Sequence, residues 1–152
     1  MNIEPYIYKA GDEDFAAGMA GTWFTWFGSH NLRATDGWQA WVIRDERGIV
    51  AWAHLEPFGD NPHKRHVARV GVCVREDARG RGLASRMIAH VVERAWEMGY
   101  LKLWATYHLP NAAAGRAFFE NDFEYEGIFE REELWDGEYV DVVSVARFRD
   151  GE

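Results

Sequence analysis

Two arginines and two glycines alternate in the segment Arg79-Gly80-Arg81-Gly82, between a strand-like stretch and a helix-like stretch. A glycine turn that opens a helix presents unpaired backbone N–H groups at the positive end of the helix dipole, and this suits an anion such as phosphate. Arginines at such a turn add charge-assisted hydrogen bonds to phosphate oxygens. The segment therefore predicts a phosphate-binding loop. The alternative is a tight turn with solvated arginines.

The residues around this loop do not match the two common phosphate-binding motifs. A dinucleotide fingerprint needs a third glycine, where this chain has Ser85, and an acid near the end of the next strand, which residues 101–106 lack. A P-loop needs Gly-Lys-Ser/Thr, which does not follow the turn. The loop is therefore expected to bind a different phosphorylated ligand.

The elements that must position the loop follow from apolar periodicity. Val70, Val72 and Val74 alternate as in a strand, and from Leu83 the apolar residues recur at helical spacing until a helix end near Gly99. The other elements predicted, in chain order, are a strand over 3–8, a helical region from about residue 12 that carries the aromatic residues 23–27, strands over 38–44, 49–58 and 66–74, a strand over 101–107 parallel to the last of these, a helix capped by Asn111, and strands over 123–134 and 138–148 joined by the turn Asp136-Gly137.

Length and composition restrict the class of protein. A chain of 152 residues with 47% hydrophobic residues and one cysteine is expected to be a single cytoplasmic domain over 1–152, without a disulfide, a metal site or a membrane span. The net charge of −8 disfavours nucleic acid and favours a cationic or amine partner. Alternating glutamates over 124–132 are expected to share one solvated strand face.

Three motifs in register resemble the GCN5-related N-acetyltransferase (GNAT) family. They are the loop Arg79-Gly80-Arg81-Gly82-Leu83-Ala84, the pair Asn111 and Ala114 at the start of the next helix, and the closing hairpin Asp-Gly-Glu-Tyr-Val-Asp over 136–141. The last resembles small bacterial members that acetylate amino acids or amines. The resemblance implies an α+β fold, a three-layer arrangement in which a mixed, mostly antiparallel sheet carries helices on both faces.

The resemblance also implies acetyl-CoA as co-substrate. Backbone groups of one strand would pair with the pantetheine arm, amides of the loop would hold the pyrophosphate, and an oxyanion hole would polarise the thioester carbonyl. The residues that match the family's cofactor positions are Val72, Cys73, Val74, Arg79, Gly80, Arg81, Gly82, Leu83, Ala84, Asn111 and Phe118.

Phe118 departs from the family pattern, in which a tyrosine protonates the leaving thiolate. Phenylalanine has no proton to donate, so Tyr107, Tyr125 or a water is expected to replace it. The sequence also leaves open which residue acts as the general base. His66 and Glu56 are the first candidates, followed by His54, His108 and proton removal through water.

The predicted function is acetyl-CoA-dependent N-acetyl transfer to the primary amine of a small molecule or an amino acid. Phe118 keeps open a CoA-binding sensor or regulatory domain with little catalysis. A protein or peptide acetyltransferase is a third possibility, which would need an open acidic groove. Alternating apolar residues over 139–148 predict a homodimer through the last strands.

Overall fold

The computed structural model describes residues 2–17 and 38–150, and this part of the chain forms one seven-stranded sheet. The strand order is β1-β2-β3-β4-β5-β7-β6. The strands are β1 (Glu4–Pro5), β2 (Gln39–Asp45), β3 (Gly48–Pro57), β4 (Val67–Val74), β5 (Lys102–His108), β6 (Glu124–Trp135) and β7 (Glu138–Phe148). The helices are α1 (Glu13–Ala17), the 3₁₀ turn η1 (Glu76–Ala78), α3 (Leu83–Glu97) and α4 (Ala112–Glu120).

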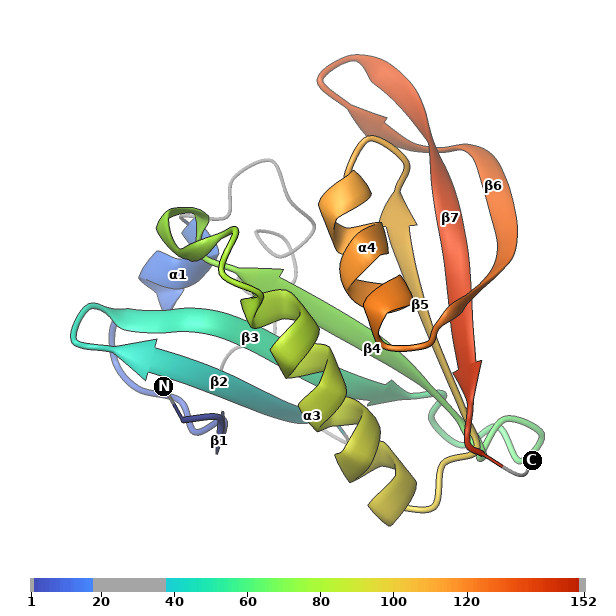
Figure 1. The fold of residues 1–152 in the computed structure, drawn as a ribbon, viewed down its shortest axis with the longest axis horizontal. Helices are drawn as coiled ribbons and strands as arrows, with labels where there is room; N and C mark the ends of the chain where they lie inside the picture. The colour runs from blue at the N-terminus through green and yellow to red at the C-terminus, as the bar shows by residue number, and fades with distance from the viewer. Residues whose placement is uncertain (1, 18–37, 151–152) are drawn as a thin grey trace.

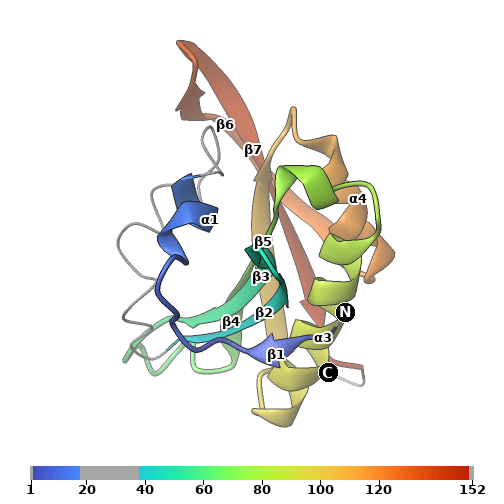
Figure 2. The same ribbon diagram turned by 90° about the vertical axis from the view of Figure 1, so that its left-hand side faces the viewer.

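The sheet is mixed and mostly antiparallel, with helices on both faces, as predicted. Among the seven strands described, only β4 and β5 pair in parallel, because α3 crosses over between them. Figures 1 and 2 show α3 and α4 on one face and α1 on the other. The expected aromatic segment 23–27 lies outside the described residues.

The parallel pair separates at one end, and this opening is the feature that the site uses. The register between β4 and β5 covers only Val67–Arg69 opposite Lys102–Trp104. Beyond it β5 continues beside β7 up to His108, while β4 continues beside β3 up to Val74 (Figure 1). Among the strands of residues 2–17 and 38–150, none pairs with the facing edges of β4 and β5 over their last residues.

Each face of the sheet has its own apolar core. The inward residues of α3 recur at the predicted spacing, and Met87, Ile88 and Val91 are fully buried against the sheet. On the opposite face, Phe15 of α1 packs with a smaller cluster that includes Trp52 and Cys73. Gly99, with φ of 93°, follows the end of α3 as predicted.

The structure corrects two predicted strands. The first strand is limited to Glu4–Pro5, and Pro5 has no N–H to donate to a ladder. Tyr6 N still donates to Ala40 O of β2, and beyond it the Asp12 carboxylate holds the chain by accepting from the Tyr6 hydroxyl and from Lys9 N. In β6, register shifts at Tyr125/Gly127 and Phe129/Glu133 interrupt the alternation. The glutamates over 124–132 are exposed as expected, but they do not share one face.

None of the helices within residues 2–17 and 38–150 has the length and apolar character that crossing a membrane requires.

Candidate active site

The loop between β4 and α3 has the backbone conformation that the glycine spacing predicted. Gly80 and Gly82 have φ of 78° and 75°, and Gly82 is the N-cap residue of α3. A Cβ atom at either glycine would find no atom within 4 Å, so the space above the loop is open. The first N–H groups of α3 therefore face a volume that a ligand can occupy.

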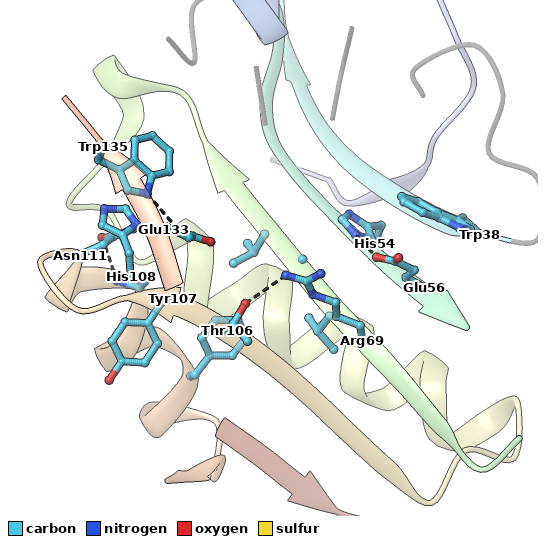
Figure 3. A pocket seen from close by; sticks show the side chains of 15 residues that line it. Trp38, His54, Glu56, Arg69, Thr106, Tyr107, His108, Asn111, Glu133 and Trp135 are labelled. Carbon is cyan, nitrogen blue, oxygen red and sulfur yellow. Dashed lines mark hydrogen bonds and ion pairs between the residues drawn. The ribbon is translucent and has the colours of Figure 1, made fainter. Parts of the chain in front are cut away.

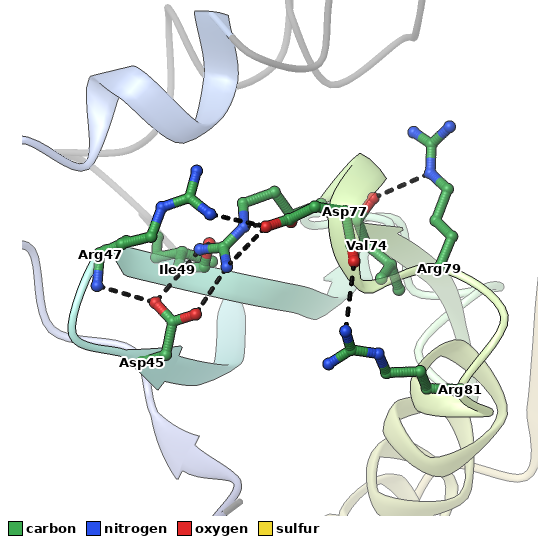
Figure 4. A network of polar contacts seen from close by, with 8 residues as sticks. Asp45, Arg47, Ile49, Val74, Asp77, Arg79 and Arg81 are labelled. Atoms are coloured by element: carbon green, nitrogen blue, oxygen red, sulfur yellow. Dashed lines mark hydrogen bonds and ion pairs between the residues drawn. The ribbon is translucent and has the colours of Figure 1, made fainter.

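An ion-pair network supports the strand end that leads into this loop (Figure 4). The Arg75 guanidinium contacts Asp45 and Asp77 at 2.6 Å each, and Arg47 contacts Asp77 at 2.7 Å. The Arg75 guanidinium lowers the pKa of Asp45 to about 2 and also lowers the pKa of Asp77. Two carboxylates thus offset the charges of Arg75 and Arg47.

In the described part of the chain, Arg79 and Arg81 contact backbone carbonyl groups instead of carboxylates. The Arg79 Nε donates to Val74 O at 3.2 Å, and Arg81 contacts Asp77 O at 3.5 Å (Figure 4). Neither makes an ion pair with a carboxylate of the described residues. Two uncompensated cations therefore flank the open loop, and this arrangement suits a polyphosphate.

A cavity of about 660 Å³ continues from the loop along the α3 and α4 side. Of the residues predicted to bind the cofactor, it is lined by Val72, Cys73, Val74, Arg79, Gly80, Gly82, Leu83, Ala84 and Asn111. Arg81 and Phe118 are not among its lining residues, although Arg81 is part of the loop. The lining also includes Ser85 and Arg116, which sequence reasoning did not identify.

Two asparagines set the position of α4 beside this cavity. The Asn111 side chain accepts from Ala114 N at 3.4 Å and caps the helix. The Asn121 Nδ2 donates to Ser85 O and Ser85 Oγ at 3.0 Å each, so the end of α4 is tied to the first turn of α3. These hydrogen bonds hold both walls of the cavity at a fixed separation.

A second cavity, of about 390 Å³, meets the first where β4 and β5 separate (Figure 3). Six polar side chains from four strands line it, and they comprise two acids, a cation, two imidazoles and a hydroxyl: Glu56, Glu133, Arg69, His54, His108 and Thr106. Its aromatic lining is Trp38, Tyr107, Trp135 and Phe118, so Phe118 borders this cavity and not the first. Both cavities are lined by Val72, His108, Asn111 and Ala114.

His54 is held in one orientation on β3. The Trp52 Nε1 donates to His54 Nδ1 at 2.9 Å, and His54 stacks on Trp38 with centroids 5.1 Å apart. Because a tryptophan nitrogen can only donate, Nδ1 is the acceptor and Nε2 carries the proton, 3.9 Å from Glu56 Oε2. Burial lowers the pKa of His54, so the ring is neutral near pH 7.

Gly71 makes this arrangement possible. It lies opposite His54 in the antiparallel register, and a Cβ atom there would lie 2.2 Å from His54 Cε1. Glu56, whose side chain is 32% exposed, is therefore the accessible proton acceptor of the pair, because the unprotonated nitrogen of His54 is directed at Trp52.

Tyr107 lies near the position of Phe118. A Cβ atom at Gly115 would lie 2.9 Å from the Tyr107 hydroxyl, so the phenol packs directly against α4, three residues before Phe118. Burial raises the pKa of Tyr107, which keeps its proton at neutral pH.

Phe118 is 2% exposed and contacts Phe123 edge to face, with ring centroids 5.2 Å apart. Tyr125 is 63% exposed and lines neither cavity.

His66 is wrongly placed for the role that the sequence suggested. It is exposed and immediately precedes β4, at the end of the strand far from the opening, about 20 Å from Val72 at the rise of a strand. It lines neither cavity. The strand direction therefore places His66 away from both cavities, whereas Glu56 and Tyr107 both line the second cavity.

Sequence reasoning missed five residues of the polar and aromatic lining of the second cavity, namely Trp38, Arg69, Thr106, Glu133 and Trp135. One signal was available, because Thr106 and His108 alternate with the apolar residues that face α3 and α4. That alternation places them on the opposite face of β5.

Comparisons with known proteins all point to one family. The model of the acetyltransferase (GNAT) family matches residues 4–125. The L-amino acid N-acetyltransferase AaaT of Escherichia coli (strain K12) is 32% identical over 90 residues, which are 58% of this chain and 55% of that protein. The match thus spans about half the length of that relative.

Two solved structures share the fold. The ribosomal-protein-alanine N-acetyltransferase from Brucella melitensis aligns with a TM-score of 0.77 at 22% identity, covering 98% of this chain and 100% of that one. A phosphinothricin acetyltransferase from Sinorhizobium meliloti, solved in complex with acetyl-CoA, aligns with a TM-score of 0.77 at 16% identity, covering 97% of this chain and 89% of that one.

Proposed function

We infer that this chain, which belongs to the acetyltransferase (GNAT) family, transfers an acetyl group from acetyl-CoA to the primary amine of a small molecule or an amino acid. The observation that carries the proposal is the pair of cavities that meet where β4 and β5 separate. One cavity begins at a cationic, glycine-lined helix start, and the other contains carboxylates. The first suits a phosphorylated donor and the second an amine.

Acetyl-CoA would lie along the first cavity, with its pyrophosphate at the amides of Gly80 to Ala84 and the charges of Arg79 and Arg81. Its pantetheine arm would run beside the free edge of β4 over residues 72–74, with Asn111 at the far wall. The thioester would then reach the opening, where the second cavity begins.

The transfer is a direct attack. The ammonium of the acceptor gives up one proton, a C–N bond forms at the thioester carbonyl carbon, and the C–S bond breaks. An amide, a thiol and one released proton result. Glu56 is the proposed proton acceptor, because its carboxylate lines the second cavity and adjoins the Nε2–H of His54.

Tyr107 is the proposed donor to the leaving thiolate. Its half-buried phenol lies against α4 near Phe118, and its raised pKa keeps the proton in place until the sulfur leaves. This assignment accounts for a phenylalanine at position 118 without a loss of acid catalysis.

The proposal is tested by release of free thiol from acetyl-CoA over a panel of amino acids, polyamines and peptides. We expect turnover with small amines, a kcat lowered about 10²-fold in Glu56→Gln, and unchanged turnover in the exposed control Glu132→Gln. Tight binding of acetyl-CoA without thiol release for any amine would instead support the sensor. Preference for peptides over free amines would support a protein acetyltransferase.

We also propose one acetyltransferase domain over 1–152, a cytoplasmic location and a homodimer. The dimer is supported by exposed apolar side chains on β6 and β7, including Ile128, Phe129, Leu134 and Tyr139. The cytoplasmic location is supported by the single cysteine, which leaves no second cysteine in the chain for a disulfide, since compartments that favour disulfides favour paired cysteines.

A further inference from the structure

We propose that Arg69 binds the carboxylate of the acceptor, and that the acceptor is therefore an α-amino acid. This inference rests on the proposed acetyl transfer and adds the substrate class and the residue that selects it. It comes from one cation in the second cavity and from the groups around it.

Arg69 is half-buried, and its contacts satisfy only part of its guanidinium. One amino group donates to Thr106 Oγ1 at 3.0 Å, and the guanidinium carbon lies 5.1 Å from the ring centre of Trp104. Within the described ranges 2–17 and 38–150, no carboxylate oxygen lies within 4.0 Å of it. Five N–H donors in a planar fork need more than one hydroxyl acceptor.

Half-buried cations without a partner are costly, and a ligand carboxylate supplies the missing partner. Arginine binds carboxylates through two parallel hydrogen bonds, and this geometry favours a planar anion over a single oxygen. Thr106 and Trp104 restrict the guanidinium from the β5 side. The open side of the fork is directed at the cavity, which Arg69 lines.

The cavity also contains the opposite charge. Glu56 is the cross-strand neighbour of Arg69, and Glu133 is held by a hydrogen bond of 2.9 Å from Trp135 Nε1. Figure 3 shows the Arg69 guanidinium in the space that separates these two carboxylates. A site with one cation between two acids matches a zwitterion. A polyamine would bring a second positive charge to Arg69.

The position of Arg69 limits the distance between amine and carboxylate in the acceptor. Arg69 and Trp104 are the last paired residues before the strands separate. Thr106, which accepts from the guanidinium, comes directly before Tyr107, the proposed acid. A carboxylate bound there lies beside the opening, so the amine that attacks the thioester must be close to it in the covalent structure. An α-amino acid meets this condition.

The test compares each of a panel of L-amino acids with its carboxamide, which retains the primary amine and replaces the carboxylate by a neutral group. In the wild type we expect kcat/KM for the acid to exceed that for the amide by 10–100-fold, mostly through KM. In Arg69→Gln the preference should fall to near unity, with kcat/KM for the acid falling far more than that for the amide. Arg69→Lys should restore part of it. Arg65→Gln, at an exposed arginine that lines neither cavity, is the matched control.

Three results would overturn the inference. The wild type could have equal kcat/KM for amides and acids, or Arg69→Gln could lower kcat/KM for both equally. In the third case, γ-aminobutyrate could have a higher kcat/KM than every α-amino acid. A urea titration of Arg69→Gln separates loss of the fold from loss of substrate recognition.

If no amine releases thiol from acetyl-CoA, the proposed acetyl transfer is refuted. Calorimetry of L-amino acids into the CoA-loaded protein then decides the role of Arg69. Binding that Arg69→Gln abolishes supports it, and equal or absent binding in both proteins rejects it.

Discussion

Gly71→Ala tests whether the second cavity depends on the close approach of His54 to the backbone of β4. An alanine methyl group would lie 2.2 Å from His54 Cε1, so the ring must retreat by about 1.2 Å to reach an ordinary contact of 3.4 Å. The ring has little freedom, because it is stacked on Trp38 and hydrogen-bonded to Trp52 Nε1 at 2.9 Å. The added methyl group is therefore expected to break that hydrogen bond.

The expected cost combines three effects. Overpacking costs about 1–3 kcal/mol, and a buried indole N–H without an acceptor costs about 1–3 kcal/mol. The lower chain entropy of alanine offsets about 0.4–1 kcal/mol. We expect the free energy of unfolding to fall by about 2–4 kcal/mol, and the Tm by roughly 2–4 °C for each kcal/mol in a chain of this size.

The assay is urea denaturation followed by tryptophan fluorescence, together with calorimetry of acetyl-CoA binding. Gly127→Ala on β6 is the control, because a Cβ atom there meets nothing within 4 Å. The same Gly71→Ala change in a His54→Ala background should cost far less, since the obstructing ring is gone. A cost below about 0.5 kcal/mol, or an equal cost in both backgrounds, refutes the reasoning. Acetyl-CoA affinity should be unchanged throughout, because Gly71 lines only the second cavity.

Four further predictions concern the loop, the acid, the buried histidine and the assembly. Gly82→Val places a β-branched residue at φ of 75°, and calorimetry should give an acetyl-CoA Kd at least about tenfold higher; an unchanged Kd removes the loop assignment. Phe118→Tyr should change kcat little, whereas Tyr107→Phe should lower it by roughly 10²-fold; a large gain in Phe118→Tyr below pH ~8.5 would contradict an acid role for Tyr107. Because burial lowers the pKa of His54, the unfolded chain binds its proton more readily. The corresponding stability is present above pH ~6.5 and lost as the pH falls, so the urea midpoint should drop less in His54→Gln than in the wild type. Light scattering at micromolar concentrations should give the mass of a dimer, and a monomer mass would reject pairing through residues 139–148.

Local interactions determined the features that the sequence by itself predicted. Gly82 at the start of α3, Gly99 at its end and the Asn111 cap depend on contacts within a few residues, so residue type and spacing were sufficient. The strand, loop and helix around Gly80 followed from the change in apolar period from two to helical. The ends of α3, the cap of α4 and the conformation of the glycine loop were therefore readable without a tertiary structure.

Only the tertiary structure decided which residues form the second cavity. Glu56, Arg69, Thr106 and Glu133 come from four strands, and the register of those strands decides which side chains become neighbours. His66 lies away from both cavities for the same reason, because strand direction places it at the opposite end of β4. Pairings between distant segments depend on the packing of the whole sheet, including the bulges in β6, and no short sequence pattern encodes that packing.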